Sequence, residues 1–120
     1  MSIPSFLLRR LYVKGSLTNV EEGFQFILTN PLANATLVKP LTLTIDDQPV
    51  DPARIKLLSE GKSLSNSEIS ESSPVDFRVN SSVTVVVEGV KLTPGEHRIS
   101  ISSSVKGYGD IKFEIKDIVK

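Results

Sequence analysis

The sequence contains no Cys, no Trp and a single His among its 120 residues. Without Cys, neither a disulfide nor a thiolate metal site can form, and a cytoplasmic location is expected. With one His, any metal or catalytic cluster that needs two imidazoles is excluded, so only carboxylates and hydroxyls remain to carry chemistry. We therefore expect no catalytic residue, no cofactor and no metal on this chain.

Charge of one sign is also lacking, because 14 Lys and Arg residues are balanced by 14 Asp and Glu residues. Duplex-binding domains carry a basic excess that neutralises phosphate, so nucleic acid is not an expected partner. No segment approaches the roughly 20 apolar residues of a membrane helix. At the start, apolar residues precede Arg9 and Arg10, the reverse of a signal peptide. The sequence predicts a soluble protein without a membrane partner.

Alanine is scarce, with 3 residues, whereas Val and Ile together number 23. Beta-branched side chains suit pleated sheets, and a chain poor in Ala is a poor source of helices. A length of 120 residues fits one domain with a core of two layers. The composition therefore favours an all-β fold in a single domain, residues 1–120.

Alternation of apolar and polar residues is the strongest pattern along the chain. In the segment 41–46, for example, Leu41, Leu43 and Ile45 alternate with threonines. The pattern predicts about eight strands, at residues 6–14, 23–29, 41–46, 54–58, 75–79, 83–88, 98–104 and 110–116. Short strands with one apolar face, separated by turn residues, are typical of an antiparallel sandwich. We predict an immunoglobulin/fibronectin-like β-sandwich.

The segment 59–74 departs from this rhythm because it is polar and rich in Ser and Glu. We interpret it as a long surface loop anchored by Leu64 and Ile69, with at most a turn of helix near residues 67–70. A solvated connection is the simpler interpretation. A binding loop is the alternative, since loops carry function disproportionately.

The single histidine, His97, follows Pro94 and Gly95 at the entry of a predicted strand. Immunoglobulin-like domains use a comparable corner between their sheets, where an aromatic residue turns its polar end against nearby backbone. Pro and Gly suit a type II turn, with Gly at the position of positive φ. We assign Pro94, Gly95 and His97 to a structural corner.

Carboxylates provide the remaining candidates for a metal or catalytic site. Asp46, Asp47 and Asp51 lie close together, but their spacing does not match a calcium loop and no Gly takes its sharp turn. Other acids are scattered over predicted loops and form no recognisable pair. Turn formation is the interpretation that we favour for these aspartates.

Exposed aromatic platforms are what a β-sandwich usually needs to bind sugars, and this chain has few aromatics. Its five Phe residues fall mostly on predicted inward faces, and it has only two Tyr residues. Tyr108, which lies between two glycines, is the aromatic residue that we expect to be exposed. A loop tyrosine without a ligand is the simpler interpretation.

Several segments in order resemble the small β-subunit family of bacterial C-glycoside deglycosidases. The segments are Gly15-Ser16-Leu17 with Asn19, Gly23-Phe24-Gln25-Phe26, Leu43 with Ile45-Asp46-Asp47 and Val50, and Leu92 with Pro94-Gly95-Glu96-His97. The resemblance implies a β-sandwich that packs against a larger barrel subunit, which holds the divalent metal and the catalytic residues. It also implies that the loop at residues 30–36 faces the partner.

The leading hypothesis is therefore a non-catalytic accessory subunit that binds a larger enzyme chain or itself. Candidate contacts are Phe6, Leu7 and Leu8, which cannot all face one core in a regular strand. Either a partner covers one of them, or, as an equal explanation, the strand is buried on both faces within the monomer. The residues that we assign as partner-facing are Asn30, Pro31, Leu32, Asn34 and Tyr108. The alternatives are a stand-alone module that binds a ligand such as a carbohydrate, and, ranked last, an enzyme acting alone.

Overall fold

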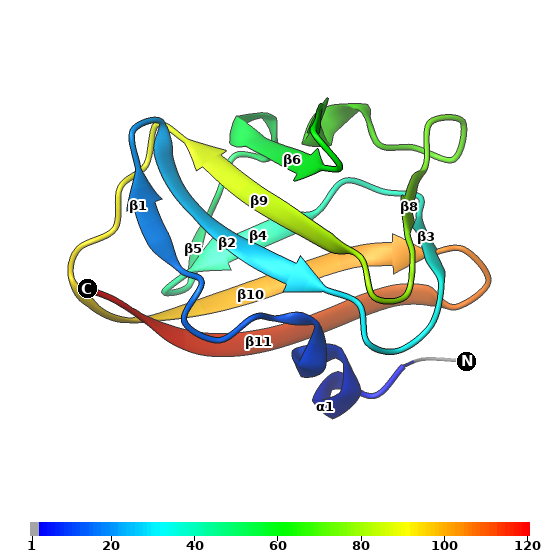
Figure 1. Ribbon diagram of the computed structural model, residues 1–120, viewed down its shortest axis with the longest axis horizontal. Helices are drawn as coiled ribbons and strands as arrows, with labels where there is room; N and C mark the ends of the chain where they lie inside the picture. Colours follow the sequence, from blue (N-terminus) through cyan, green and yellow to red (C-terminus); the bar gives the residue numbers. More distant parts are fainter. Residues whose placement is uncertain (1–2) are drawn as a thin grey trace.

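A computed structural model describes residues 3–120 of the chain as two antiparallel sheets packed face to face (Figure 1). Short helices accompany them: α1 (Ser5–Leu8), η1 (Arg9–Leu11), η2 (Pro52–Arg54) and η3 (Asn66–Glu68). None of the helices within residues 3–120 has the length and apolar character needed to span a membrane. The predicted β-sandwich is confirmed.

The first sheet has five strands in the spatial order β1 (Thr18–Val20), β2 (Gly23–Thr29), β9 (Ser82–Glu88), β6 (Ile55–Ser59) and β7 (Lys62–Ser65). Its centre is the antiparallel pair β2 and β9, in which Phe24 lies opposite Val87 and Phe26 opposite Val85. All four of these side chains are fully buried. Alternation places them on one face of the sheet, and this face forms one wall of the core.

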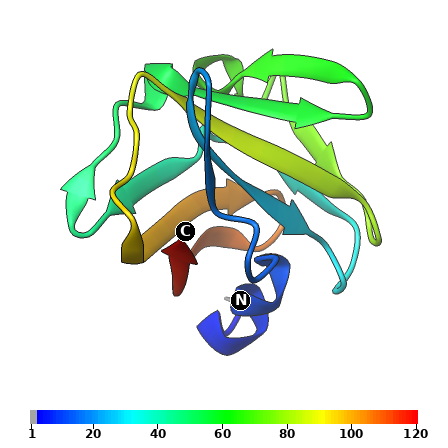
Figure 2. The ribbon, with the colours of Figure 1, turned by 60° about the vertical axis from the view of Figure 1, so that its left-hand side comes forward.

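The second sheet is built around the two longest strands, β10 (Gly95–Val105) and β11 (Gly109–Val119), which pair along their whole length. The other edge of β10 is shared by two shorter strands. Residues 99–102 pair with β4 (Thr42–Ile45), and Val105 alone pairs with β3 (Ala35–Leu37). The sheet is completed by β5 (Gln48–Pro49) beside β4 and β8 (Val75–Phe77) beside β3. Figure 2 shows the sheets as two layers.

Seven of the eight predicted strands are present, as β2, β4, β6, β8, β9, β10 and β11. The strands that the sequence did not reveal are β1, β3, β5 and β7, which have two to four residues each. Unlike β4 and β8, which lie within the longer alternating segments 41–46 and 75–79, these short strands carry no clear alternation of apolar and polar residues.

The strand predicted at residues 6–14 is wrong, because α1 and η1 occupy most of this segment. The N–H groups of Leu7 and Leu8 both donate to the carbonyl of Pro4, which opens the first turn. Leu8 and Leu11 are buried, three residues apart, while Phe6 is 62% exposed. A spacing of three matches a helical turn rather than a strand, so these apolar residues follow a helical period.

The polar segment 59–74 is more ordered than a surface loop, since it contains β7 and η3. Leu64 is half-buried and Ile69 is 2% exposed, so both predicted anchors are confirmed. The segment has a third anchor in Asn66, which is fully buried. Its amide oxygen accepts from the N–H of Leu41 at 2.8 Å, and its amide nitrogen donates to the Leu41 carbonyl at 2.9 Å.

Candidate functional site

His97 is buried in the corner at the start of β10, where both of its ring nitrogens are engaged. Nδ1 lies 2.6 Å from Oδ2 of Asp46, and Nε2 lies 2.7 Å from the carbonyl oxygen of Thr93. The contact with the Thr93 carbonyl, followed by that with Asp46, raises the pKa of His97 although burial opposes the change. Gly95, with φ of 120°, opens the corner. The imidazole has no nitrogen left for a metal or a substrate.

The aspartates at residues 46–51 shape two turns. Asp46 and Asp47 have φ of 51° and 68°, which forms the tight turn between β4 and β5. Asp47 also pairs with the guanidinium of Arg98. Asp51 caps η2, because its Oδ1 accepts from the N–H of Ala53 at 3.0 Å. Within residues 3–120, no group of three or more His, Cys, Asp or Glu side chains is arranged to hold a metal ion.

Asp46 itself is held in its ionised form by the corner. Its Oδ1 accepts from the backbone N–H of Arg98 at 2.9 Å. This bond, and then the one to His97, lowers the pKa of Asp46. The pair of His97 and Asp46 therefore joins the start of β10 to the turn after β4.

A second polar pair joins Tyr12 and Asp117 and was not predicted from the sequence. Asp117 is 3% exposed, and its Oδ2 accepts from the Tyr12 hydroxyl at 2.7 Å and from the N–H of Gly15 at 2.8 Å. Burial alone would raise the pKa of Asp117, but the hydrogen bonds from Tyr12 and from backbone N–H groups outweigh it and lower the pKa. The pair anchors the segment after η1 to the last strand, and no local pattern links residues so far apart.

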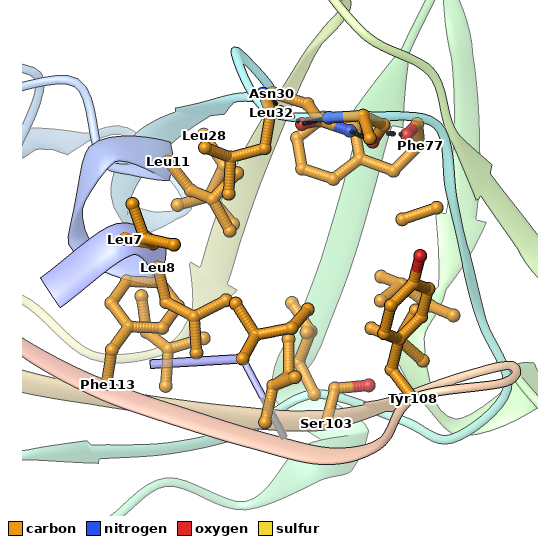
Figure 3. A pocket seen from close by; sticks show the side chains of 18 residues that line it. Leu7, Leu8, Leu11, Leu28, Asn30, Leu32, Phe77, Ser103, Tyr108 and Phe113 are labelled. Carbon is orange, nitrogen blue, oxygen red and sulfur yellow. Dashed lines mark hydrogen bonds between the residues drawn. The ribbon is translucent and has the colours of Figure 1, made fainter. Parts of the chain in front are cut away.

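The feature best suited to bind something is an apolar cavity of about 220 Å³ at the end of the sandwich where β10 turns into β11 (Figure 3). Helix α1, the loop after β2, strand β3 and the β10–β11 hairpin surround it. The lining residues are Ile3, Leu7, Leu8, Leu11, Leu28, Asn30, Leu32, Ala33, Ala35, Leu37, Leu41, Phe77, Ile101, Ser103, Val105, Tyr108, Ile111 and Phe113. No charged side chain is among them.

Three of the five residues assigned as partner-facing, Asn30, Leu32 and Tyr108, lie in this lining. Pro31 is exposed beside them, and the side chain of exposed Asn34 accepts from the N–H of Val79 at 2.9 Å. Asn30 is 2% exposed, so its side chain faces the protein interior rather than a partner. Whether the other four contact a partner stays a prediction.

Fold and site together define an all-β sandwich domain. Its polar clusters stabilise turns and chain ends, and an apolar cavity lies at the end where β10 turns into β11. A family model described as the N-terminal domain of hydroxymethylglutaryl-CoA reductase matches residues 7–120. The chain belongs to this family. No curated protein matches the chain significantly.

The family corrects the resemblance to the C-glycoside deglycosidase β-subunits, which is wrong. The residues on which the resemblance was based meet structural requirements of β-sandwiches in general. Gly23 lies where a Cβ atom would come within 1.9 Å of the Val87 carbonyl oxygen, and Asp46 with Asp47 forms a hairpin turn. Because many sandwiches share such requirements, these segments do not distinguish one family from another.

Proposed function

We propose that this chain is a non-catalytic accessory domain that packs against the catalytic part of a hydroxymethylglutaryl-CoA reductase. The description of its family, which names the N-terminal domain of that enzyme, supports the choice of partner. The barrel-shaped, metal-dependent partner came from the corrected resemblance and is not retained. A cytoplasmic location is part of the proposal.

The observation that carries the proposal is the exposure of Phe6. Its side chain is 62% exposed on α1, while its neighbours Leu7 and Leu8 line the cavity. Tyr108, which is 46% exposed, stands across the cavity on the β10–β11 hairpin (Figure 3). Aromatic side chains are enriched at protein interfaces and frequently dominate their binding energy. Two of them on one apolar end favour a protein partner there.

A carbohydrate-binding module is the weaker alternative. Sugars need exposed aromatic faces together with free hydrogen-bonding groups, whereas the cavity is lined almost entirely by aliphatic and Phe side chains. We therefore retain protein binding as the function.

The test is to express the full chain together with the catalytic part of the hydroxymethylglutaryl-CoA reductase from the same organism. The proposal expects a complex in size-exclusion chromatography with light scattering, with a mass equal to the sum of the two components. Separate elution of the two components, each at its own mass, would reject the proposal.

A further inference from the structure

We propose that the apolar cavity is a binding site for an aliphatic chain of roughly eight or nine carbons with an uncharged polar head group. The inference goes beyond the proposed function, because it concerns the interior of the sandwich rather than its exposed rim. It follows from the volume of the cavity, from the state of its polar groups and from the position of Tyr108.

The lining, rather than the volume, sets this cavity apart. Side chains that are almost fully buried, such as Leu8, Ile101 and Phe113, face a space of about 220 Å³. An engineered apolar cavity of about 150 Å³ binds benzene, which has six carbons, so by proportion this cavity accepts roughly nine.

One wall of the cavity belongs to the second sheet. Strand β3, which forms one wall with Ala35 and Leu37, is joined to β10 by one residue pair, Val105 with Leu37. Strand β4, by comparison, is joined to β10 by four pairs. Helix α1 lies on the opposite side of the cavity from this wall (Figure 3).

The inner polar groups of the lining have no hydrogen-bond donor left for a ligand. The amide nitrogen of Asn30 donates to the carbonyls of Ala33 at 2.6 Å and Phe77 at 2.7 Å, and its oxygen accepts from the N–H of Leu32 at 3.0 Å. The hydroxyl of Ser103 donates to the Lys39 carbonyl at 2.9 Å. An acceptor atom of a ligand placed inside would be desolvated without a donor, which is costly. The interior therefore selects aliphatic chains.

Tyr108 supplies the place for the head group. The polar side chains of the described lining are Asn30, Ser103 and Tyr108. The hydrogen bonds given above engage Asn30 and Ser103 but not the Tyr108 hydroxyl. Tyr108 lies between Gly107 and Gly109 at the tip of the hairpin. The residue is 46% exposed and also lines the cavity, so it has access to both solvent and cavity. A ligand with its chain inside and one hydroxyl at the rim meets both requirements.

The first experiment follows the methyl groups of the full chain by carbon–proton NMR during a titration with 1-octanol. We expect saturable shifts for the methyls of Leu8, Leu37 and Ile101, which line the cavity. The methyls of Ile55 and Leu57, which belong to the core but not to the lining, serve as the internal control. Shifts that do not saturate, or that are as large for the control methyls, would overturn the proposal.

A matched ligand tests the apolar interior. The compound 1,8-octanediol has the same chain length but carries a second hydroxyl, whose oxygen would be buried without a hydrogen-bond donor. We expect it to bind at least about tenfold more weakly than 1-octanol. Equal affinity of the two compounds would show that the chain does not enter the cavity, and would overturn the proposal.

Matched variants test the location. Ala35→Leu adds volume inside the cavity, whereas Thr36→Leu adds volume at the next residue of β3, which faces the other way. We expect about tenfold weaker octanol binding in the first variant and unchanged binding in the second. Ala33→Leu, on an exposed loop residue of the lining, repeats the test where folding is tolerant.

Unchanged octanol binding in both cavity variants would overturn the proposal. Phe6→Ser separates this inference from the proposed function, because Phe6 does not line the cavity. That variant should lose partner binding and keep octanol binding.

Discussion

The hydroxyl of Tyr12 donates a 2.7 Å hydrogen bond to Oδ2 of Asp117, across 105 positions of sequence. Both residues are buried, at 8% and 3% exposure. The bond connects the segment that carries α1 to the last strand, and so it helps to hold the wall of the cavity that α1 provides. Removing it should loosen the N-terminal segment before the rest of the sandwich.

Tyr12→Phe should lower the free energy of unfolding by about 2 kcal/mol, because a buried carboxylate loses a hydrogen-bond donor. Tyr108→Phe, which removes an exposed hydroxyl, is the matched control and should change stability by less than about 0.5 kcal/mol. Urea unfolding of the two variants measures the difference. Equal losses would show that the Tyr12 bond contributes nothing particular.

The His97 corner should make stability depend on pH. Because the folded state raises the pKa of His97, the corner stabilises the protein fully below the unfolded pKa of about 6.5. That contribution is lost as the pH rises through the folded pKa. The free energy of unfolding should therefore fall from pH 6 toward alkaline pH more steeply in the native protein than in His97→Gln. Parallel pH profiles of the two proteins would contradict this assignment.

Asn66 and Asn19 each hold the backbone of a leucine through two side-chain hydrogen bonds, but Asn66 is buried and Asn19 is exposed. Asn66 binds the N–H and carbonyl of Leu41, and Asn19 binds the same two groups of Leu92 at 2.9 and 2.8 Å. Water can replace the exposed Asn19 side chain but cannot reach Leu41. Asn66→Ala should cost about 3 kcal/mol of stability, and Asn19→Ala about 1 kcal/mol or less.

Thermal or urea unfolding of these two variants gives the comparison. A cost for Asn19→Ala equal to that for Asn66→Ala would show that burial does not decide the value of the bridge.

Gly23 is required by the close approach of β9. A Cβ atom at this position would lie 1.9 Å from the carbonyl oxygen of Val87. Gly23→Ala should therefore displace the β2–β9 pair and cost about 3 kcal/mol. Gly61→Asn is the control, since Gly61 has φ of 77° with open space around it, and Asn tolerates this conformation. A Gly23→Ala protein as stable as the control variant would refute the steric argument.

The sequence predicted the sandwich because alternation is a local property. In β2, three large apolar side chains repeat at every second residue over seven positions. The strand predicted at residues 6–14 was wrong because Leu8 and Leu11 follow a helical spacing, which the strand prediction did not take into account.

The candidate site depended on contacts that sequence does not display. Leu7, Leu32 and Tyr108 line one cavity although they come from three distant segments. Their proximity depends on how the strands and α1 pack in three dimensions, which no local sequence pattern displays. The buried pair of Tyr12 and Asp117 was also not predicted, because its two residues are 105 positions apart in the sequence.

The central claim is that the apolar end around Phe6 binds the catalytic part of a reductase. Calorimetric titration of that partner with the full chain measures it most directly, using Phe6→Ser and, as control, Ile118→Ser. Ile118 is 57% exposed, similar to Phe6 at 62%, but lies at the opposite end of β11 from the hairpin. We expect at least about tenfold weaker binding for Phe6→Ser and unchanged affinity for Ile118→Ser. No binding by the native chain, or equal losses in both variants, would contradict it.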